Sequence, residues 1–408
     1  MSFWRDPIKF IIDWALALLA STGLPEQWVT LISFVVGAFI LAAGGMFFVV
    51  FLIWYERKLI GRIQDRFGPN RVGPWGLFQP VADMLKIFTK ELITPYGVDW
   101  VAYNLAPVLA VASVLLMWAV TPFSKTFVAT NISVGILFII AVGGLGELGI
   151  ILAGWGSNNK YALVGALRAV ASLISYEIPL VISALVPVMM AGTMSLVGIV
   201  EAQKVWFVFT APAAAIIFFI SSVAETGRAP FDLAEAESEI VAGYNVEYSG
   251  LKFGMFFVGE FLHAFTSSFV FVTIFLGGWR GPGAEEIPLL GFVYFVIKTF
   301  IVYFVLILFR GTNPRFRLDQ LMNFNWKLLT PLALVVVMAT ALVDHLFSAS
   351  NDWLRIGVLI VVNLSILLIT DQLVKRRTVI PRQEASLFKR PVANPDNVFI
   401  QPGSGVKE

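Results

Sequence analysis

The hydrophobic positions of this chain gather into long apolar runs that polar segments separate. Most of the runs approach the ~20 residues that a helix needs to cross roughly 30 Å of hydrocarbon. Backbone polar groups have no water to bind inside a bilayer, so membrane-spanning runs of this kind are helical. We predict nine spans, at residues 31–54, 101–120, 134–155, 163–190, 205–223, 253–276, 289–309, 328–346 and 354–369. The pattern therefore predicts an all-α, polytopic membrane protein.

The segment ahead of the first span has the charge pattern of a secretion signal. Arg5 and Lys9 precede an apolar stretch that begins at Phe10. Asp13 lies inside that stretch and argues against a signal. We expect residues 1–30 to form an N-terminal interfacial segment.

The other polar segments divide the chain into a transmembrane domain, residues 31–374, and a C-terminal tail, residues 375–408, rich in proline and charge. Charged loops are expected within the domain at residues 55–100, 225–252 and 310–327. In the first loop, apolar residues recur at helical spacing, which predicts an amphipathic helix along the membrane surface. These residues are Phe78, Val81, Leu85, Phe88 and Leu92.

The distribution of basic residues predicts the orientation of the chain. Most of the 29 Lys and Arg residues fall in one set of alternate loops and in the tail. Basic loops remain in the cytoplasm during insertion. We therefore expect a multi-pass membrane protein with its N-terminus outside and its C-terminus in the cytoplasm.

Composition excludes several functional classes. The chain is 58% hydrophobic and 14% charged, where a soluble domain carries about 25% charged residues. Its net charge of +2 gives no indication of a nucleic-acid partner. Without cysteine, the chain has no thiolate to hold an iron–sulfur cluster. Its two histidines, His263 and His345, are too far apart for an obvious metal site, and Glu260 with His263 forms one E-x-x-H pair where a di-iron bundle needs two.

Several ionisable residues fall inside the predicted spans, where each costs roughly 2.5–3.5 kcal/mol to insert. They are Glu147, Glu177, Glu260, His263 and Lys298. Buried carboxyl groups that lack a strong cationic partner take up and release protons near neutral pH, as a proton relay requires. The alternative is structural, with each glutamate bound to backbone or paired with Lys298 or Arg168.

The densest acidic segment is ETGRAPFDLAEAESEIVAGYNVEYSG, at residues 225–250. Glu235 and Glu239 are four residues apart and would share a helical face, while Glu237 would point away. Like charges at that spacing destabilise an isolated helix by roughly 0.2–0.5 kcal/mol and raise the pKa of one another. A solvated acidic loop would have the same composition, so the order of the residues has to decide.

That order resembles the ExxRxPFDLxEAExELVxGxxxEYSG signature of one family, the H subunits of NADH:quinone oxidoreductase. In that family the protein is the membrane subunit that closes the quinone chamber of respiratory complex I. The first loop, WYERKLIGRIQDRFGPNRVGPWGLFQPVADMLKIFTKE, is similar to a second family signature. Further similar blocks are AGWGSNNKYALVGALRAVASLISYEIPL, the GEF at Glu260, and NPRFRLDQLMNFNWKLLTPLAL. The resemblance covers most of residues 54–334 and is weakest at the chain ends. Glu147 departs from it, because the family pattern has an uncharged residue there.

The resemblance implies a subunit of a proton-translocating oxidoreductase that is not catalytic alone. A peripheral arm would oxidise NADH with FMN and pass electrons through iron–sulfur clusters on partner subunits to the substrate, ubiquinone or menaquinone. This chain would hold no covalent cofactor and no metal. Its partners would be the peripheral iron–sulfur and quinone-site subunits, the small and antiporter-like membrane-arm subunits, and membrane lipid.

The resemblance also implies roles for single residues. Those expected to line or brace the quinone chamber are Arg57, Arg66, Asp83, Arg228, Phe231 and Asp232, among which Arg228 and Asp232 are spaced to pair. Those expected to couple quinone chemistry to proton movement are Glu177, Glu225, Glu235, Glu237, Glu239, Glu247 and Glu260. The arginines have an alternative role in binding peripheral subunits or lipid headgroups.

Two other functions remain open at this point. The membrane subunit of an energy-converting hydrogenase, or of a ferredoxin- or F420-linked dehydrogenase, shares the fold and parts of both signatures. A stand-alone proton or cation transporter would also place glutamates inside the membrane.

Overall fold

The computed structural model describes residues 10, 12–14, 17, 21, 25–232, 242–347 and 352–387, the last twelve of these by their backbone only. The chain divides into two units, Met1–Asn363 and Leu364–Glu408. Over the described residues, the regular structure is helical and contains no strand. Eight helices among them are long and apolar enough to cross a membrane. The prediction of an all-α, polytopic membrane protein is confirmed.

The eight spans correspond to eight of the nine predicted apolar runs. They are α2 (Glu26–Ile63), α4 (Trp100–Val120), α5 (Gly135–Gly156), α6 (Lys160–Ala191), α11 (Gly250–Phe275), α12 (Pro288–Thr312), the run of α13 (Leu318–Phe324), η3 (Asn325–Leu329) and α14 (Thr330–Leu346), and α15 (Asp352–Leu387). Several begin earlier or end later than their apolar runs, because helices continue into the polar margins of a membrane. α2 is the clearest case and continues to Ile63, well past the end of its run at Trp54.

The fifth predicted span is interrupted. α7 (Leu196–Ala202) precedes it, and the run itself contains the single turn α8 (Phe207–Thr210) and then α9 (Pro212–Glu225). Ala211 leaves helical geometry, with φ −132° and ψ 60°, just before Pro212. Proline disfavours the helical conformation in the residue before it and donates no backbone hydrogen bond. The 14 residues of α9 extend only about 21 Å, so α9 is shorter than the continuous span expected from hydropathy.

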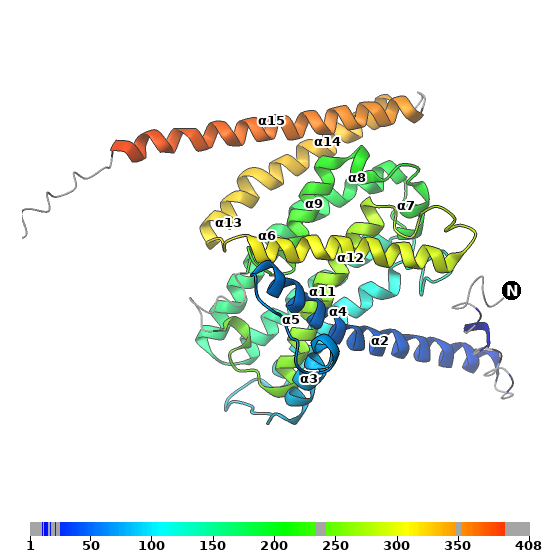
Figure 1. Ribbon diagram of the computed structural model, residues 1–408, viewed down its shortest axis with the longest axis vertical. Helices are drawn as coiled ribbons and strands as arrows, with labels where there is room; N and C mark the ends of the chain where they lie inside the picture. The colour runs from blue at the N-terminus through cyan, green and yellow to red at the C-terminus, as the bar shows by residue number, and fades with distance from the viewer. Residues whose placement is uncertain are drawn as a thin grey trace, which may run out of the picture. The chain divides into compact units, whose positions relative to one another are not determined.

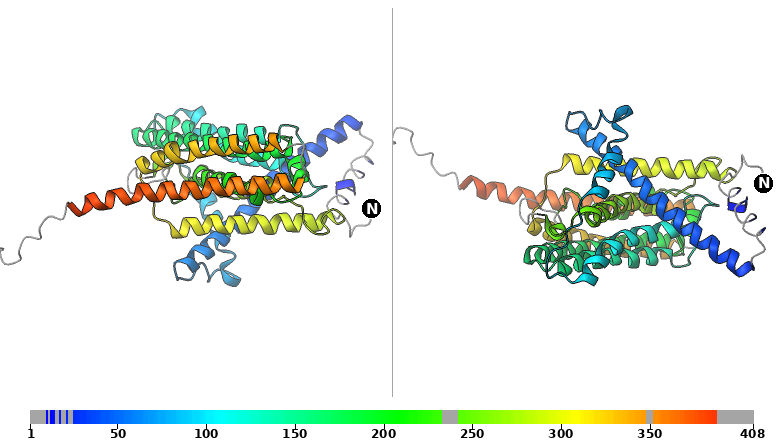
Figure 2. Two further views of the ribbon diagram at one scale, coloured as in Figure 1. Left: turned by 90° about the horizontal axis from the view of Figure 1, so that it is seen from above. Right: turned by 90° about the horizontal axis from the view of Figure 1, so that it is seen from below.

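α11 lies at the centre of the first unit. In its most apolar stretch 67% of the residues are buried, against 22% in α2. α11 packs against α2, α4, α9 and α12, and α5 and α6 complete the group around α4 and α9. Figure 2 shows α12 and the α5–α6 pair running in nearly the same direction while α2 crosses them obliquely.

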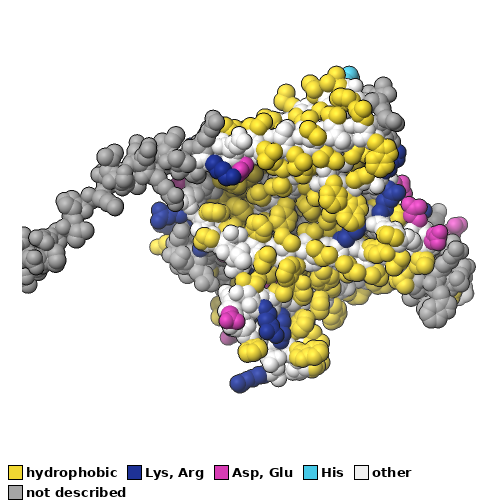
Figure 3. All heavy atoms as spheres, turned by 45° about the horizontal axis from the view of Figure 1, so that its top comes forward, with side chains coloured by type: hydrophobic (Ala, Val, Ile, Leu, Met, Phe, Trp, Pro, Cys, Tyr) yellow, Lys and Arg dark blue, Asp and Glu magenta, His cyan; other side chains and the backbone are white. Residues whose placement is uncertain are grey.

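The outer faces of these helices are apolar. Side chains such as Phe34, Phe39 and Phe47 on α2 are largely exposed. Figure 3 shows hydrophobic side chains over most of the visible face, with Lys, Arg, Asp and Glu gathered near its margins. A large exposed apolar surface is unusual for a soluble monomer, and it suits contact with lipid or with other membrane helices.

The amphipathic helix predicted in the first loop is present as α3 (Gln79–Thr89). Val81, Leu85 and Phe88 on it remain exposed. Ile87 faces inward onto Gly254 of α11, where an added Cβ would lie 2.9 Å from its Cγ2 atom. α3 therefore packs on the start of α11, beside which Figure 1 shows it, and its exposed side chains form a second apolar face.

Candidate functional site

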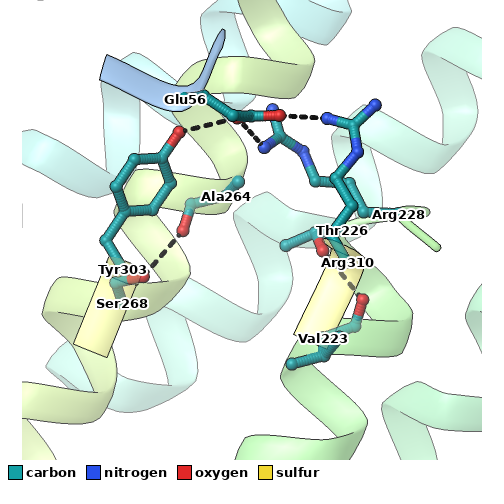
Figure 4. A network of polar contacts seen from close by, with 8 residues as sticks. All are labelled: Glu56, Val223, Thr226, Arg228, Ala264, Ser268, Tyr303 and Arg310. Carbon is teal, nitrogen blue, oxygen red and sulfur yellow. Dashed lines mark hydrogen bonds and ion pairs between the residues drawn. The ribbon is translucent and has the colours of Figure 1, made fainter. Parts of the chain in front are cut away.

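A buried ion network lies where α2, α12 and the loop after α9 meet. The carboxylate of Glu56 accepts hydrogen bonds from Nη1 of Arg228 and from Nη1 of Arg310. The hydroxyl of Tyr303 donates a third, at 3.0 Å. Figure 4 shows the carboxylate between the phenol on one side and the two guanidinium groups on the other. One glutamate thus connects three segments that are far apart in the sequence.

The central residues of this network are buried, so their charges have to be paired and hydrogen-bonded. Glu56 is 2% exposed and Arg228 is 1% exposed, whereas Arg310 is 34% exposed. Charges taken this far out of water are stable only when they are paired and hydrogen-bonded. Arg228 also stacks its guanidinium on the ring of Phe261, 4.5 Å from the centroid.

Arg228 also interacts electrostatically with Glu260, a residue outside the network. Burial by itself would lower the pKa of Arg228, but the Glu56 carboxylate raises it, and Tyr303 and Glu260 act in the same direction. The net pKa is above the ordinary value, so Arg228 stays charged. The charge on Glu260 therefore acts on Arg228 electrostatically.

Two adjoining cavities lie among the helices, and Gly227, which precedes Arg228, lines the larger of them. The larger, about 110 Å³, is lined by residues that include Glu147, Glu225, Glu260 and His263. The smaller, about 40 Å³, is lined by residues that include Glu177, Glu225 and His263. The structure therefore brings together Glu225, Glu260 and Glu177, which come from α9, α11 and α6 and to which the family resemblance gave a role in proton coupling.

Two of the three first-loop residues predicted for the quinone chamber are in contact. Arg57 at the end of α2 forms an ion pair with Asp83 of α3. Arg66 lies farther along the loop, where its Nε atom donates to Gln64 at 2.7 Å. Arg57 directly follows Glu56 in α2, so the surface ion pair and the buried network start from neighbouring residues.

Phe231 and Asp232 follow Arg228 in the loop after α9. The Phe231 ring is buried, lies 5.4 Å from the ring of Tyr176 and lines the larger cavity. Asp232 is partly exposed. The sequence suggested a pair between Arg228 and Asp232, but the ion pair that the structure gives Arg228 is with Glu56.

The acidic segment is only partly described. Glu235, Glu237 and Glu239 lie outside the described residues, so their expected roles stay predictions. Glu247 is described, and its carboxylate accepts a hydrogen bond from Nδ2 of Asn159 at 2.6 Å. Glu247 is absent from the described lining of both cavities, so its geometry connects it to the start of α6.

Sequence reasoning missed Glu56. The first predicted span ends at Trp54, so the prediction places Glu56 in the loop that follows. The helical continuation of α2 carries a buried stripe of Val49, Leu52, Ile53 and Glu56, which has the spacing of one helix face. That spacing was the available signal, because it places Glu56 on the buried face rather than in solvent.

Lys298 does not serve as the partner of an intramembrane glutamate. Its Nζ atom donates to the carbonyl oxygens of Leu276, Gly278 and Arg280 at 2.9, 3.1 and 2.8 Å. These carbonyls lie at and just beyond the end of α11, where backbone acceptors lack partners within the helix. The ammonium group thus binds the turn that follows α11, and it also lies 4.6 Å from the ring of Trp206.

Replacing Lys298 by methionine is expected to lower the unfolding free energy by about 2 kcal/mol, because it leaves partly buried carbonyls without a donor. The check is the thermal inactivation temperature of the detergent-solubilised assembly. The exposed Lys327, changed to methionine, is the matched control. Equal inactivation temperatures for the two variants would show that Lys298 does not stabilise the turn after α11.

Known proteins resemble this chain over most of its length. The family model described as NADH dehydrogenase matches residues 36–341. A protein of Geobacillus sp. (strain WCH70), named as the H subunit of NADH-quinone oxidoreductase, is 48% identical over 324 residues, which are 79% of this chain and 97% of the relative. The chain belongs to the family of NADH-quinone oxidoreductase H subunits.

Two more relatives with the same name support the assignment. The protein of Geobacillus kaustophilus (strain HTA426) is 50% identical over 77% of this chain and 94% of its own length. That of Dehalococcoides mccartyi (strain CBDB1) is 43% identical over 80% and 91%. The family model ends at residue 341, ahead of α15, in agreement with the weak resemblance expected at the chain ends.

Family membership decides between the functional classes. The chain is a multi-pass membrane subunit of an NADH-quinone oxidoreductase, so quinone is the substrate of the complex and other subunits are its partners. The alternatives of a hydrogenase-type subunit and of a stand-alone transporter have no support from these relatives.

Proposed function

We propose that the chain forms the membrane-side wall of the quinone chamber and that its interior glutamates move protons in response to quinone reduction. Arg57, Arg66, Asp83, Arg228, Phe231 and Asp232 would line or brace the chamber. Glu225, Glu260 and Glu177 would carry protons inward, and Glu235, Glu237, Glu239 and Glu247 would form its acidic side. The quinone would be ubiquinone or menaquinone.

The observation that carries this proposal is the position of Arg228. It is bound to Glu56 in the buried network, and it interacts electrostatically with Glu260 at the larger cavity. A change of charge at either place therefore changes the electrostatic energy at the other. Reduction of quinone consumes protons and changes local charge, so a group placed between chamber and cavity can couple the two events.

The partners and orientation follow from the same proposal. The basic loop at residues 55–100 and the acidic loop at residues 225–252 would face the cytoplasm and meet the peripheral subunits that carry FMN and iron–sulfur clusters. The lateral partners would be the small and antiporter-like membrane subunits. The membrane would be the bacterial cytoplasmic membrane, with the C-terminus in the cytoplasm.

The test of the proposal is Glu225→Gln, made in the complete complex and assayed in native membrane vesicles. Glu225 lines both cavities, so an amide there should stop proton transfer between them while keeping similar volume. We expect NADH-driven proton uptake to fall at least about tenfold, which is a lower bound beside the roughly 10²–10⁴-fold that general acid–base groups contribute. NADH oxidation by an artificial acceptor at the peripheral arm should stay unchanged.

The matched control is Glu201→Gln, an exposed carboxylate at the end of α7. It should pump protons and reduce quinone as the parent complex does. Normal proton uptake per electron in Glu225→Gln would overturn the proposed proton path.

A further inference from the structure

His263 occupies the junction of the two cavities. It lies on α11, three residues after Glu260, so both side chains share one face of the helix. Of the described residues, three line both cavities, and they are Met117, Glu225 and His263. Methionine carries no exchangeable proton, so Glu225 and His263 are the two groups through which protons can pass from one cavity to the other.

The distance between these two groups suits transfer rather than a fixed bond. Nε2 of His263 lies 3.7 Å from Oε1 of Glu225, longer than the roughly 2.7–3.2 Å of a settled hydrogen bond. The side chains are 22% and 20% exposed, although α11 and α9 lie within the helix bundle. A small rotation of the imidazole therefore makes or breaks the contact.

Four of the elements that line the cavities each contribute a carboxyl group, whereas α4 contributes Ala110, Ser113, Val114 and Met117 and no acid. Glu147 belongs to α5, Glu177 to α6, Glu225 to α9 and Glu260 to α11 itself. Among the described lining residues there is no Lys and no Arg. Arg228 lies outside this lining and acts on Glu260 electrostatically, so the ionisable groups that face His263 from the lining are carboxyl groups.

The cavities are large enough to complete the connection. A water molecule needs roughly 10–15 Å³ of such space and two to four polar partners. The volumes of about 110 and 40 Å³ meet the first condition, and the carboxylates meet the second. Protons can thus reach His263 directly from Glu225 or through water from the other carboxyl groups.

We propose that His263 transfers protons between the two cavities. A carboxyl group of the larger cavity loses its proton to one imidazole nitrogen and becomes a carboxylate. The imidazolium then releases the proton of its other nitrogen to a carboxylate of the smaller cavity, which leaves neutral imidazole. Neutral imidazole both accepts and donates, and so is suited to this step. The inference rests on the proposed proton path and adds its connecting group.

The test uses the complete complex in membrane vesicles with three variants. His263→Gln keeps a polar side chain that carries no proton, and we expect proton uptake per electron to fall at least about tenfold. His263→Glu restores a titratable group, and we expect it to recover part of the uptake with an altered pH profile. The other histidine, His345 at the end of α14, provides the control His345→Gln, which should behave as the parent.

The outcomes separate this inference from the function on which it rests. If Glu225→Gln stops proton uptake while His263→Gln pumps normally, His263 is not the connecting group. If His263→Glu is as inactive as His263→Gln, the histidine acts by shape, and the inference is overturned. Normal uptake in Glu225→Gln would instead remove the proton path itself.

Discussion

Replacement of Arg228 by alanine is expected to abolish quinone reduction and to destabilise the protein by about 3–5 kcal/mol. The substitution leaves Glu56 at 2% exposure with a partly exposed arginine and a phenol as its remaining donors. A buried charge without its partner keeps the free-energy cost of its desolvation and loses the interaction that offset it. This cost is larger than the free energy lost when an exposed ion pair is removed. The measurements are quinone reductase activity in membranes and the thermal stability of the solubilised complex.

A double variant distinguishes charge from shape in this network. Arg228→Met together with Glu56→Gln removes both charges and retains similar volumes, so we expect it to be more stable than either single variant. The exposed Arg315, changed to alanine, is the control for loss of an arginine at the surface. If Arg228→Ala is as stable as Arg315→Ala, the buried pair does not support the fold.

Substitution of Gly165 by valine is expected to have the second largest effect. A Cβ atom on Gly165 of α6 would lie 2.7 Å from Cα and 2.8 Å from the carbonyl carbon of Gly243. Both contacts are with backbone, which has no rotamer to escape into, so the turn η2 (Gly243–Asn245) must move. Overpacking of this kind costs typically 1–3 kcal/mol and occasionally more. Because Tyr244 of the turn lines the larger cavity, quinone-coupled proton uptake should also fall.

Gly144 of α5 gives the matched control for Gly165. A Cβ atom on Gly144 meets nothing within 4 Å, so Gly144→Val should retain thermal stability and proton uptake. The two variants are compared by inactivation temperature and by uptake per electron. Equal behaviour would show that the close approach of α6 and η2 is not needed.

Hydropathy predicted most of the fold because lipid imposes one simple condition on each span. The interruption at Ala211 and Pro212 lies within an apolar run, so mean hydropathy does not reveal it. The proline was the sequence signal for a break at this position. The predicted end of the first span, at Trp54, was wrong because polar residues do not by themselves end a helix. Hydropathy falls after Trp54, yet the backbone stays helical to Ile63 because packing against α3 and α12 replaces contact with lipid.

The sequence named several of the residues that the structure brings together at the cavities, but it did not predict their contacts, and their roles stay predictions. The family resemblance suggested Arg228 and Glu225 through the long acidic signature, Glu177 through a second similar block, and Glu260 through the GEF at that position. It gave no access to the Glu56–Arg228 pair, whose partners are 172 residues apart. The cavities depend on where helices diverge, which no local pattern records. For this reason Glu56 received no role from the sequence, although it lies within the first-loop block that resembles the family signature.

The carboxylate that Arg228 and Arg310 share limits how this part of the chain can change during evolution. Exchange of the charges of Glu56 and Arg228 would place a new arginine against Arg310, so a two-residue exchange cannot preserve the network. A second-site suppressor of a Glu56 variant must therefore satisfy two guanidinium groups at once. Genetic selection at this position should return rare multiple changes, and pairwise covariation among relatives should be weak there despite the contact.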